Sequence, residues 1–126
     1  DKNYWGPKAW EIMHIFSYSY PNNPTLTEKQ NAFNFYSSIG HLLPCHNCQQ
    51  HCIQYVTNNP PHINSREELI NWVLNFHNEV NIQLNKPIHK NYEEVRDLYE
   101  SFRARCGKKD TKHAYSIKLH SFVFPL

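Results

Sequence analysis

Two cysteines three residues apart, Cys45 and Cys48, are the side chains of this sequence best suited to chemistry. They follow Pro44, where a helix is expected to begin, so both fall on its first turn. A helix N-terminus favours negative charge and thereby lowers the pKa of a thiol placed there. A lower pKa populates the thiolate and improves the leaving group. The spacing therefore favours reversible thiol–disulfide exchange, with an electrostatic contribution expected from His46.

A metal site is the main alternative for the same segment. Four possible ligand side chains lie close together there: Cys45, Cys48, His51 and Cys52. Four ligands on so short a piece of one helix can hardly surround an ion, and common zinc sites use two ligand pairs separated by a longer loop. A thioredoxin-like interpretation would need a βαβ pattern, which is not visible. An inert structural pair, an iron–sulfur cluster and a zinc-binding helical interaction module stay open as alternatives.

A second polar cluster lies between His77 and Pro87. Helical spacing puts four of its side chains on one face, and Asn78 flanks that face: His77, Val80, Asn81 and Leu84. Such polar groups are costly when buried without partners. They are suited to a pocket for a polar ligand that carries rings. The alternative is a core histidine with its own partner and surface asparagines.

The N-terminal segment adds Trp5-Gly6-Pro7-Lys8-Ala9-Trp10 and His14. Trp10 and His14 are four residues apart, so they share one helical face and form an aromatic shelf. An adenine ring would stack on such a shelf. Ordinary core packing is the alternative interpretation.

Five segments are predicted to be helical, and together they indicate an all-α fold, a compact four-helix bundle with a short fifth helix. The first opens with Pro7 and runs to about Tyr20. The second starts at a capping box of Thr27 and Gln30. The third follows Pro44 and ends near residues 58–61. The fourth starts at a capping box of Ser65 and Glu68 and stops before Lys86-Pro87. The fifth is capped by Asn91 and extends to about residue 102.

Apolar residues at helical spacing predict which faces of these helices are buried. The expected core positions are Trp10, Met13, Phe16 and Tyr20 in the first helix, Phe33, Tyr36, Ile39 and Leu43 in the second, and Leu69, Trp72, Phe76, Val80 and Leu84 in the fourth. Residues 114–119 alternate weakly, like a strand. We therefore expect a helical domain over 1–107 and a C-terminal extension or tail over 108–126.

The composition limits the function classes. The chain has 126 residues, enough for one domain with its own core. Its net charge of +2 is small and its Lys and Arg residues are scattered, so we expect no nucleic-acid partner. The sequence has no apolar run long enough to span a membrane, and no signal peptide is visible, although the chain begins at Asp1 and an upstream segment is possible.

Taken together, these motifs resemble the Erv/ALR family of FAD-linked sulfhydryl oxidases. The matching residues are Trp5-Gly6, Trp10, His14 and Tyr20-Pro21, then Pro44 to Cys48, then His77 to Asn81 with Leu84 and Lys86-Pro87. They cover roughly residues 5–102 in the family's order. The resemblance implies a four-helix bundle with a short fifth helix, usually dimeric, with FAD bound in the bundle.

The resemblance also implies roles for single residues. Cys48 would pass electrons to the flavin, and Cys45 would exchange with incoming thiols. The implied FAD contacts are Gly6, Lys8, Trp10, His14, Tyr20, Cys48, His77, Asn78, Val80, Asn81, Leu84, Lys86 and Tyr92. The implied substrate is a protein dithiol or a thioredoxin-like protein, and the acceptor is oxygen, which gives hydrogen peroxide. No resident metal is expected. A flavin-binding scaffold without activity is a further alternative.

Two cysteines stand outside this scheme. Cys52 lies one turn after Cys48, and Cys106 lies in the basic stretch from Arg103 to Lys109. Cys52 is either a buried free cysteine or the disulfide partner of Cys106. If Cys106 does not pair with Cys52, it either shuttles electrons or cross-links a dimer. The additional cysteine pairs of cellular relatives are absent, as in the short versions carried by large DNA viruses. The location stays open between a virus assembly site in the host cytoplasm or a virion, if the chain is viral, and the mitochondrial intermembrane space or endoplasmic reticulum.

Overall fold

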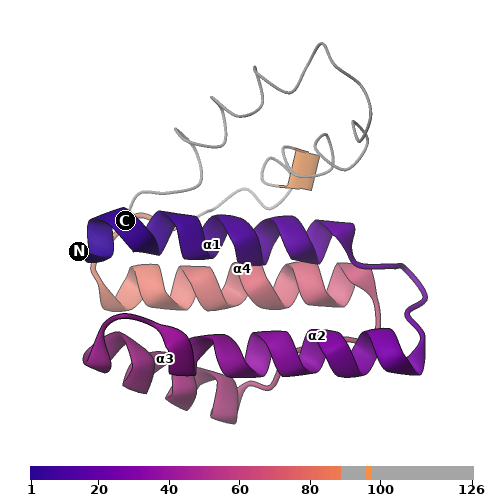
Figure 1. The fold of residues 1–126 in the computed structure, drawn as a ribbon. Coiled ribbons are helices and arrows are strands. Elements are labelled where there is room, and N and C mark those ends of the chain that lie inside the picture. The colour runs from indigo at the N-terminus through magenta and orange to yellow at the C-terminus, as the bar shows by residue number, and fades with distance from the viewer. Residues whose placement is uncertain (89–95, 98–126) are drawn as a thin grey trace. The chain divides into compact units, whose positions relative to one another are not determined.

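The computed structural model describes residues 1–88 and 96–97. Over these residues the chain is all-helical and contains no strand, which confirms the predicted class (Figure 1). The elements are α1 (Lys2–Ser19), α2 (Leu26–Ser38), the 3-10 helix η1 (Ile39–Leu42), α3 (His46–Asn58) and α4 (Arg66–Gln83). Residues 96–97, within the predicted fifth helix, are helical. The rest of that helix, residues 114–119 and the boundary at residue 107 lie outside the described residues.

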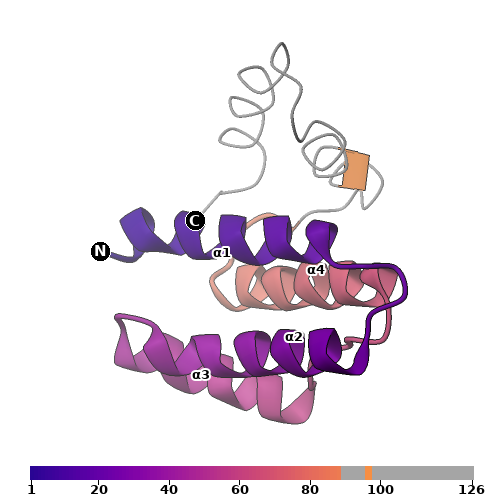
Figure 2. The ribbon, with the colours of Figure 1, turned by 45° about the vertical axis from the view of Figure 1, so that its right-hand side comes forward.

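The chain divides into two compact units, Asp1–Ser19 with Val73–Leu126, and Tyr20–Trp72. In the first unit, α1 runs alongside the part of α4 that starts at Val73 (Figures 1 and 2). In the second unit, α2 and α3 lie side by side and η1 connects them (Figures 1 and 2). None of the helices in the described part of the chain is long and apolar enough to cross a membrane.

Helix α1 begins at Lys2, and Pro7 lies inside it, so the predicted start at Pro7 is wrong. Asp1 provides the start instead. Its carboxylate accepts a hydrogen bond from the backbone N–H of Asn3 at 2.9 Å. Its carbonyl accepts from the N–H groups of Tyr4 and Trp5 at 3.0 and 3.2 Å. An aspartate at this position satisfies N–H groups that the first turn leaves without partners.

The predicted capping box of α2 is also wrong in its position. Thr25 is the N-cap: its hydroxyl accepts from the N–H of Glu28 at 3.1 Å, and the Glu28 carboxylate accepts from the N–H of Thr25 at 2.8 Å. Thr27 and Gln30 lie inside the helix. The capping box therefore lies two residues earlier than predicted, directly after Pro24. Its second member is the carboxylate of Glu28 instead of the predicted amide of Gln30.

Helix α4 starts after Ser65, as predicted, and the Ser65 hydroxyl accepts from the N–H of Glu68 at 3.2 Å. Its end is a Schellman motif. The N–H of Lys86 bonds to the carbonyl of Asn81 at 2.7 Å, and the N–H of Asn85 bonds to the carbonyl of Ile82 at 3.1 Å. Asn85 adopts φ 60°, the left-handed conformation that this motif requires.

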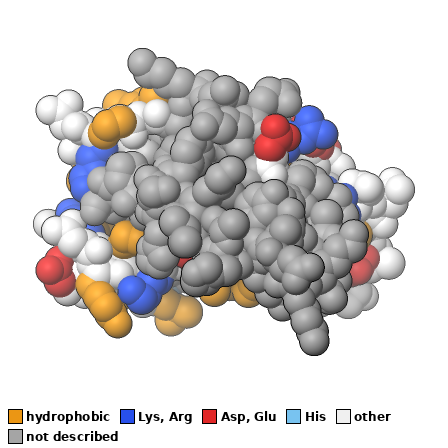
Figure 3. Space-filling view, turned by 90° about the horizontal axis from the view of Figure 1, so that it is seen from above, with side chains coloured by type: hydrophobic (Ala, Val, Ile, Leu, Met, Phe, Trp, Pro, Cys, Tyr) orange, Lys and Arg blue, Asp and Glu red, His pale blue; other side chains and the backbone are white. Residues whose placement is uncertain are grey.

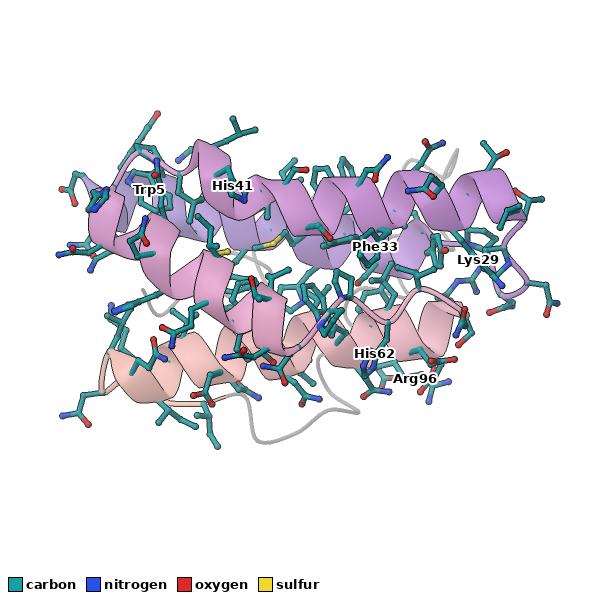
Figure 4. All side chains as sticks on the ribbon, turned by 90° about the horizontal axis from the view of Figure 1, so that it is seen from below. Trp5, Lys29, Phe33, His41, His62 and Arg96 are labelled. Carbon is teal, nitrogen blue, oxygen red and sulfur yellow. The ribbon has the colours of Figure 1, made fainter. Side chains whose placement is uncertain are left out.

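The predicted core is confirmed at most positions and wrong at some. Trp10, Met13, Tyr20, Tyr36, Leu69, Trp72 and Phe76 are buried. Phe16 and Phe33 are 48% and 39% exposed, and Ile39, Leu43, Val80 and Leu84 are only half-buried. Phe33 is seen on α2 in Figure 4, and hydrophobic side chains reach the surface in Figure 3. Helical spacing identifies a face but not how much of it a neighbour covers.

Candidate functional site

The predicted cysteine pair lies at the start of a helix, as expected. Cys45 is the N-cap of α3, with φ −130° and ψ 125°, and its sulfur accepts a hydrogen bond from the N–H of Cys48 at 3.3 Å. The two Sγ atoms lie 2.7 Å apart, with no disulfide between them. A disulfide needs about 2.05 Å, so little movement would close it. Both side chains are half-buried, so this pair has access to solvent and to reactants.

Cys52 lies in the same unit but in a different environment. It is 6% exposed and packs against Gly40 of η1, where an added Cβ would lie 2.7 Å from its Sγ atom. Burial, and secondarily the neighbouring Cys48, raises the pKa of the Cys52 thiol to about 11. A protonated, buried thiol is a poor nucleophile. Burial thus distinguishes Cys52 from the half-buried Cys45 and Cys48. Cys106 lies outside the described residues.

The zinc interpretation finds no support in this unit. Among the described residues, no group of three or more His, Cys, Asp or Glu side chains is arranged to hold a metal ion. All four proposed ligands are among these residues. His51 is exposed, whereas Cys52 is buried.

In the other unit, the structure brings together the predicted aromatic and histidine residues of α1 and α4. The indole of Trp10 stacks on the imidazole of His77, with ring centroids 4.1 Å apart and an angle of 8° between the planes. His14 Nε2 lies 2.9 Å from His77 Nδ1, so one ring donates a hydrogen bond to the other. All three side chains are almost fully buried. The predicted Trp10–His14 shelf is thus a three-ring cluster that includes His77.

Asn81 lies one turn after His77, as the spacing predicted, and it is fully buried. Neither its side-chain oxygen nor its side-chain nitrogen has a hydrogen-bond partner within the described part of the chain. An unsatisfied buried amide costs about 1–3 kcal/mol. A polar molecule that reached this amide would remove that cost, so the residues present fit a polar ligand that carries rings.

The remaining predicted ligand residues vary in accessibility. Gly6 is buried, and Asn78, Val80, Leu84 and Lys86 are half-buried. Lys8 is exposed, and its ammonium group lies 3.9 Å from the ring centroid of Tyr4. Tyr92 lies outside the described residues.

Tyr20 belongs to the unit that carries the cysteines. Its hydroxyl donates to the carbonyl of Ile63 at 2.6 Å, and burial, with a contribution from Glu28, raises its pKa. The structure thus gives Tyr20 a structural role in the loop before α4, where it also accepts, through its carbonyl, a hydrogen bond from Arg66.

Two residues of this unit were not predicted from the sequence. Gly40 leaves room for Cys52, and a glycine inside a helical pattern was the available signal. Gln49 donates from its amide to the carbonyl of Leu43 at 2.7 Å. No sequence pattern indicates this contact, because it depends on the path of the loop before α3. His41 lies on the neighbouring η1 turn and is exposed (Figure 4).

Comparisons with known proteins agree with these features. Residues 7–103 match the sequence profile of the Erv1 / Alr family. The chain is 35% identical over 116 residues to an FAD-linked sulfhydryl oxidase of African swine fever virus, covering 90% of this chain and 97% of that protein. It is 38% identical over 89 residues to a putative FAD-linked sulfhydryl oxidase of Invertebrate iridescent virus 3, covering 69% of this chain and 60% of that protein.

The fold is similar to solved structures of the same kind. The crystal structure of the FAD-binding domain of Erv1 from Saccharomyces cerevisiae superposes with a TM-score of 0.72 at 31% identity, covering 76% of this chain and 90% of that one. A mutant of the same yeast protein with two cysteines replaced by serine superposes with a TM-score of 0.76 at 30% identity, covering 80% of this chain and 85% of that one.

Proposed function

The chain belongs to the Erv1/Alr family, and from this premise we propose that it is an FAD-linked thiol oxidase that makes disulfides in protein substrates. The observation that carries the proposal is the pair of sulfur atoms 2.7 Å apart at the N-cap of α3. Such a pair can cycle between dithiol and disulfide with little movement. It is half-buried, so substrate thiols can reach it.

The first step is thiol–disulfide exchange at Cys45. A substrate thiolate attacks the Cys45 sulfur of the Cys45–Cys48 disulfide, a mixed disulfide forms, and Cys48 leaves as a thiolate. The N–H groups at the start of α3 favour negative charge on the sulfur atoms there. The leaving thiolate is therefore stabilised by its position at the start of the helix.

The second step releases the product. The second substrate thiolate attacks the substrate sulfur of the mixed disulfide, the substrate disulfide forms, and Cys45 leaves as a thiolate. Two electrons have then moved from the substrate to the enzyme, and the substrate has lost two protons. By the family pattern, Cys48 is the thiol that passes the electrons on.

The FAD would be held by the cluster of Trp10, His14 and His77 together with Asn81. Its fit rests on the fully buried Asn81 amide, which has no hydrogen-bond partner in the described part of the chain. The rings of this cluster are buried, with Trp10 stacked on His77, so they would exclude water from the site. When bound, FAD supplies the two-electron chemistry that reoxidises the dithiol and reduces oxygen to hydrogen peroxide.

The further predicted contacts belong to the same proposal. They are Gly6, Lys8, Tyr20, Cys48, Asn78, Val80, Leu84, Lys86 and Tyr92. Lys8 is exposed, as a residue that meets phosphates would be. Tyr20 is a weaker candidate, because its hydroxyl already donates to the Ile63 carbonyl. We also propose the family arrangement, with FAD bound inside a four-helix bundle, a short fifth helix, a domain over residues 1–107 and a homodimer.

The test is the absorbance spectrum of the purified protein, followed by oxygen uptake with dithiothreitol. The proposal predicts a yellow protein with flavin absorbance that consumes oxygen when the dithiol is added. A colourless protein with stoichiometric zinc would support the interaction-module alternative. A yellow protein without thiol-dependent oxygen uptake would support a flavin-binding scaffold.

A further inference from the structure

Gln49 makes hydrogen bonds to Cys45 and to the residue two positions before it. Its backbone N–H donates to the carbonyl of Cys45 at 2.9 Å, as part of α3. Its side-chain amide donates to the carbonyl of Leu43 at 2.7 Å. One residue of the helix thus binds the carbonyl of Cys45 and the carbonyl two residues before it.

The segment that Gln49 holds connects η1 to α3. Leu43 and Cys45 both have extended backbones, with ψ 142° and 125°, and they join η1 to α3 outside either helix. At the η1 end, close packing of Gly40 on Cys52 fixes the chain against α3. At the other end, Cys45 starts the helix. Between these points, the side-chain amide of Gln49 binds the carbonyl of Leu43.

We propose that Gln49 is a positioning residue for the redox pair, which keeps Cys45 where its sulfur meets that of Cys48. The sulfur–sulfur distance depends on the backbone path through residues 43–45, because Cys45 lies at its end. A loosened segment must be ordered again each time the disulfide closes, and this ordering costs conformational entropy. Loss of the anchor therefore weakens the disulfide relative to the dithiol.

The effect can be measured with glutathione, independently of the flavin. Two glutathione thiols and the Cys45–Cys48 disulfide exchange to give oxidised glutathione and the Cys45/Cys48 dithiol, and two electrons move from glutathione to the protein. A hydrogen bond of ordinary net strength corresponds to about threefold to tenfold in this equilibrium. Tenfold corresponds to about 30 mV in the reduction potential of the pair. The inference rests on the proposed function only in that this pair must be redox-active.

The experiment compares Gln49→Met with Gln50→Met in the complete protein. Met fills the space of Gln but cannot donate a hydrogen bond. Gln50 is the next residue of α3 and is exposed, so its replacement is a matched control. Gln49→Glu serves as a second, equally sized variant whose ionised carboxylate also cannot donate. The proteins are equilibrated without oxygen in glutathione buffers, and the oxidised fraction of the pair is measured by thiol alkylation and mass spectrometry.

We expect both Gln49 variants to shift the equilibrium about threefold to tenfold towards the dithiol, with Gln50→Met close to the unmodified protein. Equal equilibria in Gln49→Met, Gln49→Glu and the control would overturn the positioning role while leaving the thiol oxidase proposal intact. If the pair of the unmodified protein never forms a disulfide in any buffer, the proposed function itself fails. The melting temperatures of the reduced proteins separate a general loss of stability from the specific shift.

Discussion

Asn81 combines complete burial with an amide that has no hydrogen-bond partner among the described residues. If this position contributed to stability alone, an apolar residue would give a higher free energy of unfolding, because no buried amide would be left without a hydrogen bond. The backbone carbonyl of Asn81 is already used in the C-terminal cap of α4, so the unsatisfied part is the side chain alone. A polar side chain kept at such a cost points to a ligand that uses it.

The stability and the cofactor affinity should therefore change in opposite directions in Asn81→Leu. Removing the unsatisfied amide should raise the free energy of unfolding of the FAD-free protein by about 1 kcal/mol. The affinity for FAD should fall by about tenfold or more, since one hydrogen-bond partner is lost. Denaturant unfolding and a flavin fluorescence titration measure the two quantities.

Asn75→Leu is the control, because Asn75 lies on the same helix and is exposed. It should change the FAD affinity little. A destabilised Asn81→Leu protein that still binds FAD with full affinity would show that the amide has a structural partner instead of a ligand.

Cys52 should behave differently from the reactive pair towards thiol reagents. With its pKa raised to about 11 by burial, only about one Cys52 thiol in a thousand is ionised at pH 8. Alkylation of the native, reduced protein with iodoacetamide at pH 8 should therefore label Cys45 and Cys48 first and Cys52 last. Peptide mass spectrometry over time checks the order; early labelling of Cys52 would mean that it is not buried in solution.

Because folding raises the pKa of the Cys52 thiol, the free energy of unfolding depends on pH. Folding raises the pKa of Cys52 from 9.0 to about 11, so the unfolded chain loses this proton at lower pH than the folded one. The contribution of Cys52 to stability is complete below pH 9 and is lost between about pH 9 and 11. Cys52→Ala should remove this part of the decline, as measured by denaturant unfolding at several pH values.

Among the helices, α2 allows a direct test of which residue caps its N-terminus. The observed capping box joins Thr25 and Glu28, whereas the sequence pattern favoured Thr27 and Gln30. Thr25→Ala should lower the free energy of unfolding by about 1 kcal/mol, since the helix loses its N-cap. Thr27→Ala should have a smaller effect, because Thr27 lies inside the helix. Thermal unfolding of both variants measures the two losses of stability. A larger loss in Thr27→Ala than in Thr25→Ala would support the predicted capping box of Thr27 and Gln30.

The helices were predictable from the sequence, and so was the start of α4 after Ser65, but the first residues of α1 and α2 were not. Apolar spacing and the loops rich in proline and asparagine indicate where helices lie. The start of α1 depends on Asp1, and that of α2 on a choice between two threonines that both have a suitable partner three residues on. Competing caps differ by a fraction of a kcal/mol, which a pattern does not resolve.

The parts of the candidate site that depend on neighbouring residues could be predicted from the sequence, whereas the parts that depend on distant residues or on the path of a loop could not. The Cys45/Cys48 pair is local, so its spacing was enough to place it at a helix start, although Cys45 is the extended N-cap and not part of the first turn. The stacking of Trp10 on His77 joins residues far apart in the sequence, and the pattern indicated only which faces they share. The anchor from Gln49 to Leu43 follows the path of a loop, which no periodicity describes.

In the whole molecule, the cysteine pair that reacts with thiols and the residues proposed to hold FAD belong to different units of the chain. The dithiol lies within Tyr20–Trp72, and the cluster proposed to hold FAD lies on residues of Asp1–Ser19 and of the stretch beginning at Val73. Helix α4 belongs to both units. The enzyme needs both parts, so a variant can retain the flavin and lose all reaction with thiols.

Anaerobic reduction of the flavin makes direct use of this separation. The FAD-loaded protein and its Cys48→Ser variant are mixed with dithiothreitol in the absence of oxygen, and the flavin absorbance is followed. We expect the unmodified protein to lose its yellow colour, whereas Cys48→Ser binds FAD equally well and stays yellow, with Cys52→Ala behaving like the unmodified protein. Bleaching of Cys48→Ser at the rate of the unmodified protein would contradict the proposal that electrons reach the flavin through Cys45 and Cys48.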